Sequence, residues 1–252
     1  MMNRRLPLLG RPFSITFAAM PEYILVIAAL CAGAFAAYRL GKLTRAGAVA
    51  AGLTGIIVFF GSGYFGLAVL FAFFGMGVVA TAHGKARKAV GGGAQQRRNA
   101  GQVFANGGMA ALLSLLMAAG EGPVLPYPIM LAAALASASA DTVSSELGTL
   151  YGRRFINILT FRREANGLDG VVSLEGTLAG IIASAVIASI YSAFGGGLTG
   201  GLIITAAGTT GNLADSILGA TLERKGIIRN DAVNFMNTAI AALAAWGLWA
   251  AV

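Results

Sequence analysis

The chain has 252 residues, of which 57% are hydrophobic and 11% are charged, and its mean hydropathy is +0.76. Apolar runs of helix length recur along it without period-two alternation, which excludes an ordinary water-soluble domain and a membrane β-barrel. A single cysteine and a single histidine exclude a disulfide and a multi-histidine metal site, and the net charge of +8 is better explained by topogenic lysine and arginine than by nucleic-acid binding.

The apolar runs predict an all-α fold, a polytopic transmembrane helical bundle of about seven to eight spans. Residues 1–20, which are basic and contain two prolines, are expected to form an interfacial N-terminal arm. Residues 21–252 are expected to form a single transmembrane helical domain. In chain order, the expected spans are 22–38, 46–61, 64–82, 102–119, 127–148, 176–194, 199–222 and 232–251.

Two of the expected spans contain glycine-rich interruptions. The second runs into Gly61-Ser62-Gly63, which separates it from the third. The seventh contains the segment GTTGN, residues 208–212, and a helix can unwind at such a segment where it is surrounded by protein or water. We therefore expect a break in the seventh helix near mid-membrane.

The basic residues test this topology. If the segment from Arg39 to Arg45 is cytoplasmic and the spans alternate from there, 15 of the 18 lysines and arginines fall in cytoplasmic loops, and only the three of the N-terminal arm do not. The opposite loops, near residues 62, 122 and 196, contain neither lysine nor arginine. The sequence thus predicts a multi-pass protein of the cell (inner) membrane with both termini outside. The span count drops by one if the N-terminal arm re-enters the membrane or lies on its inner surface.

Acidic residues occur near the predicted cytoplasmic ends of the fifth and seventh spans. Asp141 and Glu146 lie on the fifth, and Asp215 lies on the seventh. A carboxylate inside a span costs at least ~2.5 kcal/mol, and several together repel one another unless a cation lies between them. Neither span contains lysine or arginine, so these three residues are predicted to bind Mg²⁺. Structural hydrogen bonding between helices is the alternative role for the aspartates.

Further polar residues are expected at the same end of the bundle. They are Lys42, Arg45, Asn106, Asp169, Ser173, Glu175, Thr177, Asn212, Glu223 and Asn234. Residues 166–180 place glycines, a serine and a threonine at the start of a helix, where backbone N–H groups suit phosphate. Ordinary interface charges are the alternative reading of Asp169 and Glu223, and helix packing is the alternative for the hydroxyl residues.

Several of these residues belong to sequence blocks that resemble a known family. SADTVSSELG, NGLDGVVSLEGTLAG, NLADSILGATLE, NDAVNFMNT and GQVFANGG resemble the signature blocks of the phytyl-phosphate kinase family of plants and cyanobacteria. The resemblance covers roughly residues 40 to 245 and extends distantly to dolichol kinase and CDP-archaeol synthase. The chain has Leu168 where the family pattern has threonine, so one hydroxyl contact of the family is missing here.

The resemblance implies an enzyme that transfers the γ-phosphate of a nucleoside triphosphate, with CTP favoured, to a prenyl (phytyl-like) monophosphate at the cytoplasmic face. It implies catalytic roles for Asp141, Glu146, Asp169, Glu175 and Asp215, of which Asp169 and Glu175 would bind a second ion or the ribose. It also implies that the basic residues Lys42 and Arg45 bind phosphates. The asparagines Asn106, Asn212 and Asn234 would orient acceptor or nucleotide, with Ser173, Thr177 and Glu223 nearby.

The expected partners are the lipid bilayer and the isoprenoid monophosphate, with no nucleic acid, and an oligomer is left open. Three other functions compete with the kinase. They are a lipid-phosphate transporter or flippase, a CTP-dependent cytidylyltransferase, and a structural membrane protein without chemistry. A transporter would place its polar site near the middle of the membrane, whereas the acids of this chain crowd toward one side.

Overall fold

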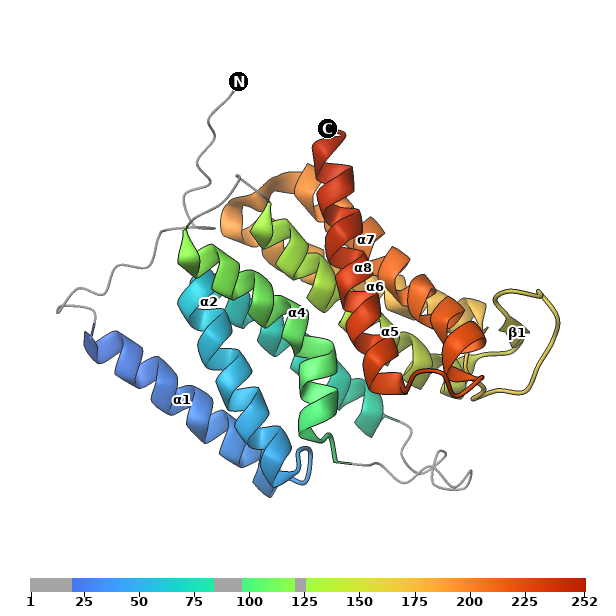
Figure 1. Cartoon of the computed structure of the whole chain (residues 1–252), viewed down its shortest axis with the longest axis horizontal. Helices are drawn as coiled ribbons and strands as arrows, with labels where there is room; N and C mark the ends of the chain where they lie inside the picture. Colours follow the sequence, from blue (N-terminus) through green and yellow to red (C-terminus); the bar gives the residue numbers. More distant parts are fainter. Residues whose placement is uncertain (1–19, 84–96, 121–125) are drawn as a thin grey trace.

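The computed structural model describes residues 20–83, 97–120 and 126–252, so the expected N-terminal arm lies outside the described residues. The described elements form a helical bundle, which confirms the predicted all-α fold (Figure 1). In chain order they are α1 (Met20–Arg39), α2 (Arg45–Ala82), α4 (Ala100–Ala119), α5 (Tyr127–Tyr151), β1 (Ile156–Asn157), β2 (Val171–Val172), α6 (Leu174–Tyr191), η2 (Ser192–Gly196), α7 (Gly197–Leu218), η3 (Gly219–Glu223) and α8 (Asn230–Ala250).

The long element α2 reverses direction at Gly63. This residue has φ 62° and ψ −150°, a backbone conformation that glycine adopts readily and other residues do not. Gly47 and Gly77 both lie against Arg98, although 30 residues of straight helix would separate them by about 45 Å. The two arms of α2 therefore run antiparallel, as predicted for the second and third spans.

A second reversal joins α6 to α7 through η2. Gly195 and Gly197 have positive φ angles of 92° and 76°, and they lie where the chain turns back. Near the other end of the pair, Gly180 of α6 lies against Asn212 of α7, so these two helices are also antiparallel.

The expected break in the seventh helix was wrong. α7 is helical from Gly197 to Leu218, and its glycines serve close packing. A Cβ atom on Gly208 would lie 2.7 Å from the Cβ of Ala136, and one on Gly211 would lie 2.3 Å from the Oγ of Ser137. Small residues at these positions let α7 approach α5 closely.

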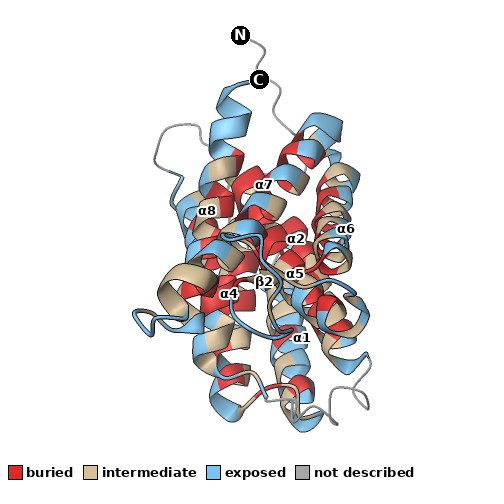
Figure 2. Cartoon of the chain, turned by 90° about the vertical axis from the view of Figure 1, so that its right-hand side faces the viewer, coloured by how far each residue is buried: buried red, intermediate tan, exposed pale blue. Residues whose placement is uncertain are grey.

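Helix α5 occupies the centre of the bundle. It packs against α2, α4, α6, α7 and α8, and its residues from Leu131 to Ala140 are buried. Alanines and serines dominate this stretch, which allows five neighbours to fit around one helix. Figure 2 shows buried residues in the interior of the bundle and exposed ones on its outer faces.

The outer faces are apolar. Large hydrophobic side chains such as Leu25, Val79 and Leu198 are exposed there, as expected for contact with lipid. Among the described residues, five helical stretches are long and apolar enough to cross a membrane, and two of them contain the reversals at Gly63 and at η2. Together with the central α5, this arrangement agrees with a multi-pass protein of about seven to eight spans.

Polar and basic segments gather at one end of the bundle. Alternation of the helices places residues 39–45, 97–99, 152–173 and 224–229 at this end, and Figure 1 shows β1 there, opposite the C-terminus. Every lysine and arginine within the described ranges lies in or beside these segments. We call this the basic end.

Candidate functional site

A polar cavity of about 300 Å³ opens at the basic end, between α5, α6, α7 and the segment that precedes α6. Hydroxyl, amide and carboxylate groups make up much of its wall. The sequence-predicted site residues that line it are Asp141, Asp169, Ser173, Thr177, Asn212, Asp215 and Glu223. Four separate segments of the chain thus contribute predicted residues to one cavity.

Two carboxylates from different helices meet in this cavity. The carboxyl groups of Asp141 on α5 and Asp215 on α7 both line the cavity and lie close enough to interact directly. Two carboxylates so close must share a proton or a cation, because two uncompensated charges at this distance repel strongly. The pair is therefore suited to binding a positively charged group.

A buried asparagine on α8 fixes the position of Asp215. The Nδ2 of Asn237 donates a hydrogen bond to Oδ1 of Asp215 at 2.7 Å. Its own Oδ1 accepts from Oγ of Ser137 on α5 at 3.0 Å, and the Asn237 side chain has no solvent exposure. Both ends of the amide are used, so the asparagine links three helices through a single defined orientation.

A second amide, that of Asn212, lies beside the acid pair. The hydroxyl of Ser144 donates to its Oδ1 at 3.2 Å. Gly180 of α6 leaves the space for this amide, since a Cβ atom there would lie 2.8 Å from Nδ2 of Asn212. The cavity therefore depends on close approach of α6 to both α5 and α7.

Ser173 and Thr177 line the cavity and also shape the start of α6. The Oγ of Ser173 caps the helix by accepting a hydrogen bond from N–H of Gly176 at 3.1 Å. The hydroxyl of Thr177 donates to the carbonyl of Ser173 at 2.9 Å. Both hydroxyl residues therefore stabilise the start of α6 in addition to lining the cavity.

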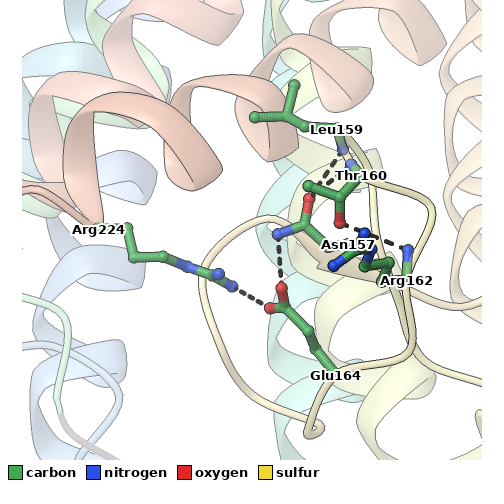
Figure 3. A network of polar contacts seen from close by, with 6 residues as sticks. All are labelled: Asn157, Leu159, Thr160, Arg162, Glu164 and Arg224. Atoms are coloured by element: carbon green, nitrogen blue, oxygen red, sulfur yellow. Dashed lines mark hydrogen bonds and ion pairs between the residues drawn. The ribbon is translucent and has the colours of Figure 1, made fainter.

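The segment between β1 and β2 forms the outer wall of the cavity. It is held by Asn157, whose Oδ1 accepts from the N–H groups of Leu159 and Thr160 at 2.9 and 3.2 Å (Figure 3). Nδ2 of Asn157 donates to Oε1 of Glu164 at 3.0 Å, and Oε2 of Glu164 pairs with Arg224 at 2.8 Å. The hydrogen bond from Arg224 lowers the pKa of Glu164. The network ties this wall to the chain just after η3.

Glu146 does not line the cavity. It lies near Arg98, whose pKa is lowered because the effect of burial exceeds the opposing effect of the carboxylates of Glu146 and Asp141. The expectation that these acids lack a protein cation was therefore incomplete. The counter-charge comes from the segment before α4, which is far from α5 in sequence.

The remaining predicted residues lie outside the polar cavity. Oε2 of Glu175 accepts from the backbone N–H of Arg153 at 3.4 Å, and Nε of Arg45 donates to the Tyr38 hydroxyl at 3.2 Å. Lys42 contacts Arg98 through its backbone carbonyl. The other two are Asn106, which lines a different cavity, and Asn234, which is buried on α8 one turn before Asn237.

Three features that shape the polar cavity and its surroundings were not predicted from the sequence. They are the Asn237–Ser137 contact, the position of Arg98, and the network around Asn157. A signal existed for Asn237, since it shares a helix face with Asn234, three residues earlier. No comparable signal exists for Arg98, which resembles every other loop arginine in the sequence.

The acid pair fits part of the predicted magnesium site. Within the described ranges, no group of three or more Asp, Glu, His or Cys side chains is arranged to hold a metal ion. Mg²⁺, however, commonly binds through one or two carboxylates and completes its shell with water and substrate phosphates. The pair of Asp141 and Asp215 meets that requirement, whereas the predicted set that also includes Glu146 is not assembled.

Comparison with known proteins matches residues 28–242 to the family described as integral membrane protein DUF92. Uncharacterized membrane protein MJ0933 of Methanocaldococcus jannaschii is 38% identical over 143 residues, which cover 57% of this chain and 59% of that protein. Protein VTE6, chloroplastic, of Arabidopsis thaliana is 34% identical over 146 residues, which cover 56% and 44%. Uncharacterized membrane protein sll0875 of Synechocystis is 34% identical over 176 residues, which cover 67% of each chain. The match thus spans about half the length of the first two relatives, and no solved structure matches.

Proposed function

The chain belongs to the integral membrane protein family DUF92, and we propose that it is a membrane-embedded kinase that transfers a nucleotide γ-phosphate to a prenyl monophosphate. The observation that carries this proposal is the contact of Asp141 with Asp215 in a polar cavity at the basic end. The resemblance of the surrounding blocks to phytyl-phosphate kinases supports the choice of substrates. The concentration of lysine and arginine supports a cytoplasmic position for this end.

Asp141 and Asp215 would hold Mg²⁺, which when bound neutralises phosphate charge and orients the transferred group. Asn237 keeps Asp215 in place for this role. Asn212 and Ser144 add neutral oxygens next to the pair. In this proposal Glu146 pairs electrostatically with Arg98 and takes no part in binding the ion.

The reaction asks little covalent chemistry of the protein. The acceptor phosphate has a second pKa of about 6, so it is mostly ionised near neutral pH and needs no strong general base. One of its oxygens forms a bond to the γ-phosphorus, while the bond from that phosphorus to the bridging oxygen breaks and releases the nucleoside diphosphate. Positioning and charge neutralisation supply the rate enhancement. Asp169 and Glu223, on the cavity wall, are suited to hydrogen-bond the ribose hydroxyls.

Two observations disfavour a transporter. The cavity lies at one end of the bundle rather than at its middle, and α7 is continuous where a broken helix was expected. A cytidylyltransferase would use the same cavity, and the two enzymes differ in their products.

The test is to incubate the purified full chain with Mg²⁺, each nucleoside triphosphate in turn, and a panel of prenyl monophosphates. We expect mass spectrometry to detect the prenyl diphosphate and the nucleoside diphosphate. Transfer of CMP to the acceptor would replace the kinase with a cytidylyltransferase. Absence of any product with every nucleotide would refute the proposal.

A further inference from the structure

A second cavity, of about 280 Å³, lies between α1, the two arms of α2, and α4. Its wall is almost entirely apolar and includes Leu30, Leu70 and the ring of Phe73. It is separate from the polar cavity, because no residue lines both. A space with this lining suits a hydrocarbon chain.

Two buried oxygens in this cavity wall have no hydrogen-bond partner. They are Oγ1 of Thr54 and Oδ1 of Asn106, in side chains that are 2% and 9% exposed. The two residues lie on facing helices, since a Cβ atom on Gly107 would be only 3.2 Å from Cγ2 of Thr54. Buried polar atoms are nearly always hydrogen-bonded, so these two oxygens are available to a water or to a polar ligand group that enters the cavity.

Arg98 lines the apolar cavity and lies near acids of the basic end. Its guanidinium carbon lies 5.8 Å from the centroid of the Phe73 ring, which lines the same cavity. Its guanidinium is also near enough to Glu146 and to Asp141, which lines the polar cavity, for their charges to interact with it. A phosphate bound at Arg98 would therefore lie between an apolar chain site and the acid pair.

We propose that the apolar cavity binds the hydrocarbon chain of an isoprenoid monophosphate, with the phosphate held at Arg98 and directed toward the polar cavity. This inference rests on the proposed kinase function and locates its acceptor. The hydroxyl of Thr54 donates to an oxygen of the bound head group. A protonated phosphate oxygen, or a water bound with it, donates to Oδ1 of Asn106.

The experiment fills the cavity and compares the effect with a matched substitution elsewhere. Gly33 of α1 lines the cavity, and a Cβ atom there would meet no other atom within 4 Å, so Gly33→Leu adds a large side chain at the cavity wall where the backbone leaves room for its Cβ. Gly75 of α2 is exposed, is equally unobstructed and does not line the cavity, so Gly75→Leu is the control. Binding of a radiolabelled C20 prenyl monophosphate to each purified full chain is measured, with the C20 alcohol and inorganic phosphate as competitors.

We expect Gly33→Leu to weaken binding of the monophosphate by at least about tenfold and Gly75→Leu to change it by less than about twofold. Both variants should bind Mg²⁺-nucleotide as the wild type does. We further expect the monophosphate to compete much better than either the alcohol or inorganic phosphate, and Arg98→Gln to remove its advantage over the alcohol.

Unchanged binding in Gly33→Leu, or equal losses in both glycine variants, would overturn the inference. Equal competition by the alcohol and the monophosphate would overturn the role of Arg98. Turnover separates this inference from the kinase proposal. If the wild type phosphorylates the monophosphate and Gly33→Leu does so with the same KM, the cavity assignment fails and the kinase stands. If no turnover occurs but binding is lost in Gly33→Leu alone, the cavity assignment stands and the kinase fails.

Discussion

Replacement of Asn237 by alanine tests whether the α8 amide positions the acid pair. The change removes a 2.7 Å hydrogen bond to Asp215 and a 3.0 Å hydrogen bond from Ser137, at a position with no solvent exposure. A hydrogen bond to a charged group contributes about 1.5–3 kcal/mol and a neutral one about 1 kcal/mol. If the bond to Asp215 is needed in the transition state, its loss lowers kcat about 10- to 100-fold, at about 1.4 kcal/mol per factor of ten.

The assay is prenyl monophosphate turnover at saturating substrate, with thermal unfolding measured on the same preparations. Asn234→Ala is the matched control, because Asn234 is a buried asparagine one turn earlier on α8, whereas the hydrogen bond to Asp215 comes from Asn237. We expect both variants to lose some stability and only Asn237→Ala to lose most of its kcat. Equal losses of kcat in the two variants, or full activity in Asn237→Ala, would refute the positioning role.

Three further predictions concern the acid pair, the outer wall and the turn in α2. Asp141→Asn should insert and fold normally but lose at least about a hundredfold in turnover, because removal of one preorganised electrostatic group typically has that effect. Turnover and membrane insertion are measured on the same preparations. A normal rate would exclude Asp141 from catalysis. Arg224 lowers the pKa of Glu164 in the folded protein. The ionised Glu164 therefore stabilises the segment between β1 and β2 at pH values above the usual pKa of glutamate. This stabilisation is lost as the pH falls through the lowered pKa of the folded protein. Amide hydrogen exchange of that segment should accelerate across this acidic window, and the step should be absent in Glu164→Gln. Gly63→Ala should lower the free energy of unfolding by about 1–3 kcal/mol, since φ of 62° with ψ of −150° strains alanine. Gly75→Ala is the control and should not destabilise the protein. Thermal unfolding of both variants is measured, and equal unfolding midpoints for the two would contradict the strained turn.

The helices themselves were largely predictable from local pattern. Apolar runs and loop charges located the helical spans within a few residues of their observed ends. Even the reversal at Gly63 followed from the sequence, because two glycines around a serine interrupt an otherwise apolar run. The same kind of signal failed in α7. Glycines at 208 and 211 that can loosen a helix are also the residues that permit close packing, and the sequence does not say which helix comes near.

Which acidic residues form the pair in the polar cavity was less predictable. Asp141 and Glu146 are five residues apart on one helix, which rotates Glu146 by about 140° away from Asp141. Because they are close in sequence, both were predicted to belong to one Mg²⁺ site. The rotation, however, places Glu146 near Arg98 and away from the polar cavity. Asp215 meets Asp141 only because α5 and α7 pack in register through alanine, serine and glycine.

By itself, the sequence determined that the chain is a bundle of membrane helices, where those helices begin and end, and that its charged residues gather at one end. These properties depend on the transfer of side chains between water and lipid, which is summed residue by residue along the chain. Only the tertiary structure decided which acids touch, that Asn237 holds one of them, and that Arg98 lines the apolar cavity near Asp141. Those contacts depend on the rotation and spacing of helices that are distant in sequence, and helix packing fixes both.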